Sequence, residues 1–318
     1  MELTTVVRRG LGLLVVVAVL AATPGCSLRR IAINSVANTL AESGDTFASD
    51  ADPELIRDAV PFSLKLVESL LVEVPKHRGL LLTACSGFTQ YAYAFVDGDA
   101  EFLKLEDYTR YTKLQDRARK MYVRGRDYCL RSLELEYPGI RQTLNDDPDK
   151  AVAVFDKKDV PLLYWTGASW GKAVALSLDR PALAGDFPIV QAVVRRALAL
   201  DESFNSGAIH DVMITLEALP REMGGDVERA RHHYERSLQH TNGNSAGPHV
   251  SYAMNVLLPQ QKRAEFVALL NKALEVDIDR EPKLRLANVL AQQYAQYLME
   301  HLDELFLSDK ETSSVYER

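Results

Sequence analysis

Apolar residues recur at intervals of three and four along most of the chain, the spacing that places them on one face of a helix. The first clear helix start is Asp52-Pro53-Glu54, where a capping side chain precedes a proline and an acid in the first turn. No convincing segment alternates with the period of two that a half-buried strand requires. The pattern therefore predicts an all-α protein. The expected helices cover roughly 54–73 (interrupted at Pro61), 76–96, 107–136, 148–155, 160–178, 186–200, 207–219, 226–240, 248–258, 260–276 and 281–306.

Small and aromatic residues within these helices recur as in the second helix of a tetratricopeptide (TPR) repeat. Around positions 70, 132, 197, 237 and 273 the windows are similar, and they are separated by 62, 65, 40 and 36 residues. The later separations approach the roughly 34-residue TPR period, whereas the earlier ones leave room for extra helices. We therefore expect an irregular TPR-like array of helix pairs, an α-solenoid, in which each pair buries its apolar face on the next. The expected packing residues are Ala197, Ala230, Tyr234, Ser237 and Ala273.

The last predicted helix carries an apolar stripe that runs from Ala287 to Leu305, as a capping helix at the end of such an array would.

The N-terminus has the pattern of a bacterial lipoprotein signal peptide. Arg8 and Arg9 precede twelve apolar residues, 11–22, which are too few for a spanning helix of roughly 20 residues. Cys26 follows a small residue at the end of this run and resembles a lipobox cysteine, although Thr23 and Pro24 depart from the usual residues. We expect Cys26 to be acylated, with ordinary secretion as the alternative. A serine after Cys26, where an aspartate often signals inner-membrane retention, favours the outer membrane.

The chain is thus divided into a leader (1–25), a lipidated N-terminus and tether (26–52), a TPR-like helical domain (53–308) and a polar tail (309–318). Its 318 residues, 47% of them hydrophobic, can bury a substantial core. The formal net charge of −7 gives no electrostatic reason to expect nucleic acid as a partner.

Two cysteines, Cys85 and Cys129, remain after the lipobox cysteine. An oxidising compartment would allow a disulfide between them. Both lie in apolar helical sequence, where single cysteines are usually small buried side chains. The pattern favours unpaired cysteines and leaves the bridge open.

No catalytic constellation, cofactor motif or metal-ligand spacing is evident. Gly224-Gly225 reads as a turn, not a phosphate-binding loop, because no strand precedes it. His232, His233 and His240 could act as metal ligands, but the pattern favours a solvated helix face. Candidate ligand-binding residues come from the aromatic segment 162–177 and from a helix that carries two polar residues seven apart. They are Tyr164, Trp165, Trp170, His210 and Glu217, each with core packing as the alternative.

Several segments taken together resemble one known family. They are ASDADPELIRDAVPFSLKLVESLL, QYAYAFVDGDAE, RGRDYCLRSLE, LLYWTGASWGKAVALS, GAIHDVMITLEALPREMGGDVERARHHYERSL and the C-terminal AEFVALLNKALEVD with PKLRLANVLAQQYAQYLMEHLDELF. They resemble the T component of TPR-associated TRAP transporters, the TatT family, from about Phe47 to Phe306.

The resemblance implies a periplasm-facing lipoprotein without enzymatic activity that forms homotrimers. It also implies association with the solute-binding P component of a TRAP transporter, and an apolar tunnel for a hydrophobic, optionally carboxylated, lipid-like ligand. The alternative is a TPR scaffold lipoprotein that organises an envelope assembly without a small-molecule ligand. A scaffold would more often keep regular 34-residue repeats, which the early 62- and 65-residue spacings do not.

Replacing Cys26 with Ser should release the protein from membranes, because acylation of this thiol is the expected anchor. Fractionation of cells expressing the Cys26→Ser and Ser27→Ala chains measures this, with incorporation of labelled palmitate as a second readout. A Cys26→Ser chain that stays with the membranes would refute the anchor.

Overall fold

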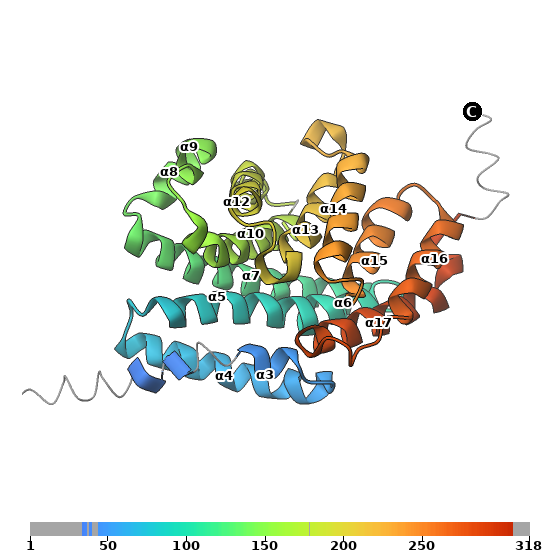
Figure 1. Ribbon diagram of the computed structural model, residues 1–318, viewed down its shortest axis with the longest axis horizontal. Coiled ribbons are helices and arrows are strands. Elements are labelled where there is room, and N and C mark those ends of the chain that lie inside the picture. Colours follow the sequence, from blue (N-terminus) through green and yellow to red (C-terminus); the bar gives the residue numbers. More distant parts are fainter. Residues whose placement is uncertain (1–33, 37, 40–43, 178, 308–318) are drawn as a thin grey trace, which may run out of the picture.

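The computed structural model describes residues 34–36, 38–39, 44–177 and 179–307. Within these ranges the chain forms helices and no strand, which confirms the all-α prediction (Figure 1). The leader, Cys26 and the polar tail lie outside the described residues.

The longer helices, in chain order, are α4 (Pro53–Glu73), α5 (Arg78–Ala92), α7 (Tyr108–Glu136), α10 (Val160–Ala175), α12 (Phe187–Leu200), α13 (Phe204–Glu217), α14 (Val227–His240), α16 (Arg263–Leu274) and α17 (Arg285–Glu300). The shorter ones are α3 (Gly44–Ala48), α6 (Gly98–Leu103), α8 (Ile140–Asp146), α9 (Pro148–Val152), α11 (Pro181–Ala184), α15 (Gly247–Tyr252) and α18 (Leu302–Leu305). Two π-helical turns, η1 (Tyr93–Asp97) and η4 (Ala253–Leu257), continue α5 and α15.

Helix α4 is continuous through Pro61, so the expected interruption there is wrong. The proline removes one backbone donor and costs about 3 kcal/mol in an isolated helix. Ile56 before it and Leu64 and Val67 after it are all buried. Because α4 packs against α5, tertiary burial on both sides of the proline outweighs the local cost.

Three local features were not visible in the sequence pattern. Helix α8 begins after Gly139, which adopts a positive φ of 84°. Inside α13 the residues Asn205, Ser206 and Gly207 all have left-handed backbone angles. The two π-helical turns insert an extra residue into helices that the periodicity predicted as regular.

Successive helices pack on one another along the chain. The contacts join α4 to α5, α5 to α7, α7 to α10, α10 to α12, α13 to α14, α15 to α16 and α16 to α17. Figure 1 shows α4 and α5 side by side along the long axis, with α12 to α15 crossing above them. The TPR-like geometry of this array remains a prediction.

The residues that were expected to pack between helices are at close helix contacts. Ala197, Ala230, Ser237 and Ala273 are fully buried. Tyr234 is half-buried, and its hydroxyl lies 2.8 Å from Nδ1 of His249 on α15.

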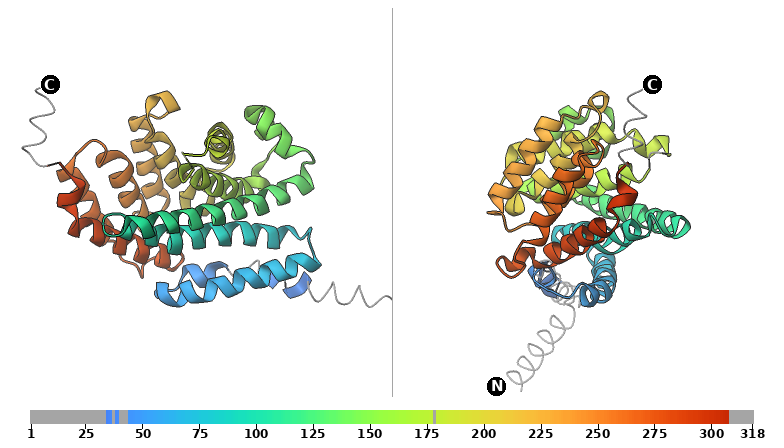
Figure 2. Two further views of the ribbon diagram at one scale, coloured as in Figure 1. Left: turned by 180° about the vertical axis from the view of Figure 1, so that it is seen from behind. Right: turned by 90° about the vertical axis from the view of Figure 1, so that its right-hand side faces the viewer.

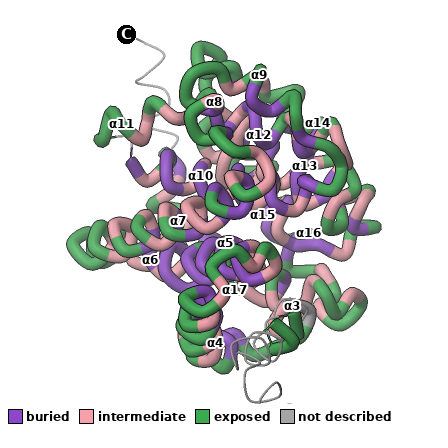
Figure 3. Tube along the Cα trace, turned by 90° about the vertical axis from the view of Figure 1, so that its left-hand side faces the viewer, coloured by how far each residue is buried: buried purple, intermediate pink, exposed green. Residues whose placement is uncertain are grey.

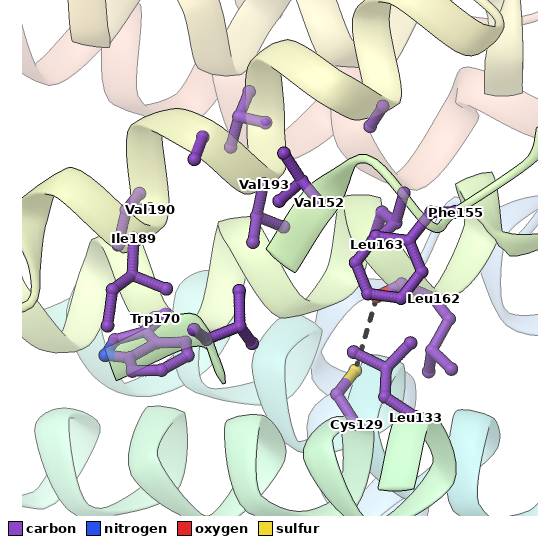
Figure 4. Close-up of a cluster of buried hydrophobic side chains, with 14 of the residues drawn as sticks. Cys129, Leu133, Val152, Phe155, Leu162, Leu163, Trp170, Ile189, Val190 and Val193 are labelled. Carbon is purple, nitrogen blue, oxygen red and sulfur yellow. Dashed lines mark hydrogen bonds between the residues drawn. The ribbon is translucent and has the colours of Figure 1, made fainter. Parts of the chain in front are cut away.

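The core is formed by three clusters of buried side chains, one for each group of neighbouring helices. Figure 4 shows part of the middle cluster, where Trp170 and Leu163 of α10 meet Ile189 and Val193 of α12. The tube in Figure 3 has its buried segments toward the middle of the molecule and exposed segments around the rim.

Helix α17 closes the array by returning to its beginning. Besides α15 and α16 it contacts α3 and α4, and Arg285 donates a 2.9 Å hydrogen bond to the Ser49 carbonyl. The rings of Tyr294 and Tyr297 pack edge-on against Phe102 of α6. Figures 1 and 2 show α17 beside the N-terminal helices. The C-terminal end of the array therefore packs against its N-terminal end.

Asn288 of α17 fastens the other side of this closure. Its fully buried side chain accepts a hydrogen bond from the Ala246 N–H at 2.9 Å and donates one to the Asn244 carbonyl at 2.8 Å. The link between α14 and α15 is therefore held to α17 by both polar atoms of one amide.

Cys85 of α5 and Cys129 of α7 form a disulfide with a Cα–Cα distance of 5.3 Å, so the preference for unpaired cysteines is wrong. Helical periodicity placed both cysteines on buried faces but gave no register between two helices. Gly125 allows the close approach, since a Cβ there would lie 3.0 Å from the Cys85 carbonyl oxygen and 2.7 Å from Thr89 Oγ1. The pairing agrees with an oxidising compartment.

Replacing both cysteines of this disulfide with alanine should lower the free energy of unfolding by roughly 2–4 kcal/mol, because the cross-link restricts the unfolded chain. Chemical denaturation with and without reductant measures the change. The Cys26→Ser chain serves as the control and should unfold like the parent. Thiol titration of the denatured, unreduced protein that finds Cys85 and Cys129 free would contradict the pairing.

Candidate functional site

The π-helical turn η1 carries two polar side chains at the end of α5. It carries Tyr93 and Asp97, and π-helical turns occur often at functional sites. Gly98 follows directly, and a Cβ there would lie 3.1 Å from the Tyr93 carbonyl oxygen. The turn therefore places an aromatic and an acidic residue at the inner end of α5.

Lys172 of α10 binds this turn. Its Nζ lies 3.0 Å from Asp97 Oδ2 and 4.9 Å from the centre of the Tyr93 ring, over its face. Asp97 also accepts a 2.9 Å hydrogen bond from the hydroxyl of Tyr122, a fully buried residue of α7. Three elements thus converge on one carboxylate.

Lys172 is partly exposed and lies among polar groups. Its side chain is 42% exposed, and Tyr93 beside it is 61% exposed. Burial is the largest single influence on the Lys172 pKa and lowers it, while Asp97, Tyr93 and Glu101 together raise it above its usual value. The ammonium therefore has a fixed carboxylate partner and surface that a ligand can reach.

Tyr164 of α10 and Asp211 of α13 lie at the same interior. Burial raises the pKa of Tyr164, and the Asp211 charge raises it further. Burial also raises the pKa of Asp211 to about 6, although a hydrogen bond from Ser237 lowers it. Both side chains are only partly covered, so they resemble Lys172 in combining accessible surface with desolvation.

Helix α17 contributes the opposite wall. The Tyr294 hydroxyl lies 3.5 Å from Glu101 Oε2 of α6. Burial raises the pKa of both groups. The Tyr93 ring lies under the Lys172 ammonium, and the Tyr93 charge is a lesser cause of the raised pKa values of Tyr164, Lys172 and Tyr294. We call this set the Tyr93–Lys172 site. It consists of Tyr93, Asp97, Glu101, Tyr164, Lys172, Asp211 and Tyr294.

The aromatic candidates from the sequence are divided by the structure. The Tyr164 ring packs edge-on against Trp165 and in a tilted arrangement against Phe204. Trp165 is half-buried against the middle core cluster. Trp170 is buried in that cluster, donates a 2.9 Å hydrogen bond to Asp186 and has the Arg126 guanidinium over its ring.

His210 and Glu217 lie on one face of α13, as their spacing predicted, and this face is turned to α14. Glu217 is buried and pairs with Arg229, whose Nε lies 2.8 Å from Glu217 Oε2. His210 Nδ1 lies 2.9 Å from His233 Nδ1. Neither residue belongs to the Tyr93–Lys172 site.

Sequence reasoning missed Tyr93, Asp97, Glu101, Lys172, Asp211 and Tyr294. Lys172 lies in the same aromatic segment as Trp165 and Trp170. The aromatic residues of that segment predicted a ligand site, and the lysine gave no separate signal. The partner of Lys172 is 75 positions away in the sequence, so no local pattern could identify it.

A pocket lies on the outside of α7. It is lined by Pro75, Arg131, Glu134, Leu135 and Arg141 and does not touch the Tyr93–Lys172 site.

No helix in the described part of the chain combines the length and apolar character needed to cross a membrane.

Comparison with known proteins gives two findings. A family model described as TRAP transporter T-component matches residues 49–306. The chain is also similar to an uncharacterized protein of Treponema pallidum (strain Nichols), with 31% identity over 302 residues that cover 89% of this chain and 94% of the relative.

Proposed function

Because this chain belongs to the TRAP transporter T-component family, we propose that it binds the solute-binding P component and passes a hydrophobic solute with a carboxylate through the Tyr93–Lys172 site. Family membership itself establishes an accessory role in TRAP transport at the cell envelope. It is a family of transporter accessories and not of enzymes. What we propose beyond this role is that the partner is the P component and that the solute is a hydrophobic carboxylate.

One observation carries the proposal for the solute: the desolvated yet accessible Lys172. An ammonium has three donors, and Asp97 takes one of them while the Tyr93 ring covers another side. A carboxylate is the strongest acceptor for a remaining donor in a confined, weakly screened interior.

The tyrosines suit the apolar part of such a solute. Tyr93, Tyr164 and Tyr294 supply three aromatic rings with hydroxyl groups beside Asp97, Glu101, Lys172 and Asp211. Small-molecule sites typically combine apolar or aromatic walls with a small number of placed polar groups. Trp165 beside Tyr164 extends these walls.

The remaining parts of the proposal concern the assembly. Acylation at Cys26 would tether the helical body to the outer membrane on its periplasmic face, and the body would assemble as a homotrimer. In this arrangement the P component delivers or collects solute at the opening of the Tyr93–Lys172 site.

Replacing Lys172 with Met should weaken palmitate binding at least 10-fold and leave hexadecanol binding within twofold, because only the carboxylate needs the ammonium. Displacement of a fluorescent fatty acid from the purified protein measures both affinities. Lys113→Met is the matched control, since Lys113 is exposed on α7. The Lys172→Met, Asp97→Asn double variant avoids an unpaired buried carboxylate and should behave like the single variant. Equal loss for both ligands, or no binding by the parent, would contradict the solute assignment.

The P component encoded in the same organism should copurify with this chain after crosslinking in cells. Its recovery should persist in the Lys172→Met chain, because the substitution removes a solute contact and not a contact with the P component. A T component that never captures the P component would instead favour an envelope scaffold without a small-molecule ligand.

A further inference from the structure

Three potential metal ligands from separate segments meet at one end of α13, away from the Tyr93–Lys172 site. Glu202 lies in the link between α12 and α13, His210 is on α13, and His240 is the last residue of α14. One ligand atom from each lies within 4.8 Å of the other two. The His210 and His240 rings are 5.3 Å apart.

His210 has a buried nitrogen that lacks a partner. The residue is 2% exposed, and its Nε2 makes no hydrogen bond within the described part of the chain. The nearest acceptor is Glu202 Oε2 at 3.5 Å, which is longer than a good hydrogen bond. A buried polar atom without a partner is rare and calls for a physical reason.

The other nitrogen of His210 fixes the chemistry of the free one. His210 Nδ1 lies 2.9 Å from His233 Nδ1, so one of these nitrogens donates a proton and the other accepts it. When His210 donates this proton, its Nε2 carries a lone pair that points toward Glu202. Metal-bound histidines are commonly held in this way by a hydrogen bond at the second nitrogen.

The backbone of α13 holds His240 in place. Gly207 has a φ of 80°, and a Cβ there would lie 2.7 Å from the His240 Cβ and 2.9 Å from its ring. Asn205 and Ser206 before it also have left-handed angles, which cost of order 1–3 kcal/mol at non-glycine residues. This turn brings His240 against the first regular turn of α13, next to His210.

We propose that Glu202, His210 and His240 bind one divalent transition-metal ion of the Zn²⁺ class. Two imidazoles and a carboxylate suit zinc, whereas Mg²⁺ and Ca²⁺ prefer oxygen ligands only. Ligand atoms on a tetrahedral zinc are roughly 3.3 Å apart, and Glu202 Oε2 already lies 3.5 Å from His210 Nε2, so the half-buried His240 ring makes most of the adjustment. A solvent molecule fills the fourth position. The ion joins the α12–α13 link to the end of α14.

Arg236 is the cation now nearest to these groups. Its Nη2 lies 2.7 Å from Glu202 Oε1 and 3.3 Å from His240 Nε2. Glu202 Oε2 remains available, so Arg236 can keep its bond to Oε1 and orient the carboxylate. The contact between Arg236 and His240 is given up when the metal binds.

The test is titration of the tag-free full chain in detergent with Zn²⁺ by calorimetry and with Co²⁺ by visible absorption. The chain carries Cys26→Ser so that no free thiol competes. One ion per chain should bind, with the absorption bands of a four-coordinate cobalt ion. Glu202→Gln and His240→Asn should each weaken binding at least 10-fold, since each removes one of three ligands. His232→Asn is the matched control, an exposed histidine on the same helix, and should change affinity less than twofold.

The His233→Ala variant tests which nitrogen of His210 carries the proton. His233→Ala should weaken binding less than loss of a ligand does but more than His232→Asn, because it frees His210 to rotate. Because Glu202 is exposed, Glu202→Gln keeps the test valid even if a histidine variant unfolds. Absence of saturable binding, or equal affinity in the Glu202→Gln and His232→Asn chains, would overturn the proposal.

Discussion

The structure depends on one constraint: no helix of this chain can cover its own apolar stripe, so each must be covered by a neighbour. In an open array the first and last helices would remain half-bare. Here α17 meets this requirement by contacting α3 and α4 as well as α15 and α16. The side-chain pairs that fasten it, Tyr294 with Glu101 and Asn288 with the α14–α15 link, therefore do more than stabilise one helix. They hold the C-terminal part of the array against its N-terminal part.

The buried Asp97 carboxylate is tolerated because it is paired and hydrogen-bonded. Lys172 and Asp97 neutralise each other, and Tyr122 supplies a further hydrogen bond to the carboxylate. Removing either charge alone would leave the other desolvated and unpaired, which is costly. The pair is thus stable only as a unit, and a solute that engages Lys172 must do so without displacing Asp97.

Much of the fold could be predicted from the sequence, because burial on one face leaves a periodic record. The helices, the slim packing residues such as Ala230 and Ser237, and the shared face of His210 and Glu217 follow from spacing alone. The contacts that could not be predicted depend on how neighbouring helices are aligned along their axes. The Cys85–Cys129 pair, the Lys172–Asp97 pair and the meeting of Glu202 with His240 each join positions whose relation is set only when helices dock. The prediction of an interruption at Pro61 was wrong for the opposite reason, because tertiary packing outweighs the local cost of a proline inside a helix.

The disulfide also governs how α5 and α7 may slide past each other. Cys129 lies seven residues, about two turns, beyond Tyr122 on α7, and Cys85 lies two turns before the π-helical turn on α5. A slip of a single turn, about 5.4 Å, would carry the Tyr122 hydroxyl out of reach of Asp97. The covalent link forbids that slip. A chain kept in a reducing environment therefore lacks the fixed axial alignment on which its interior is assembled, and it matures fully only where thiols oxidise.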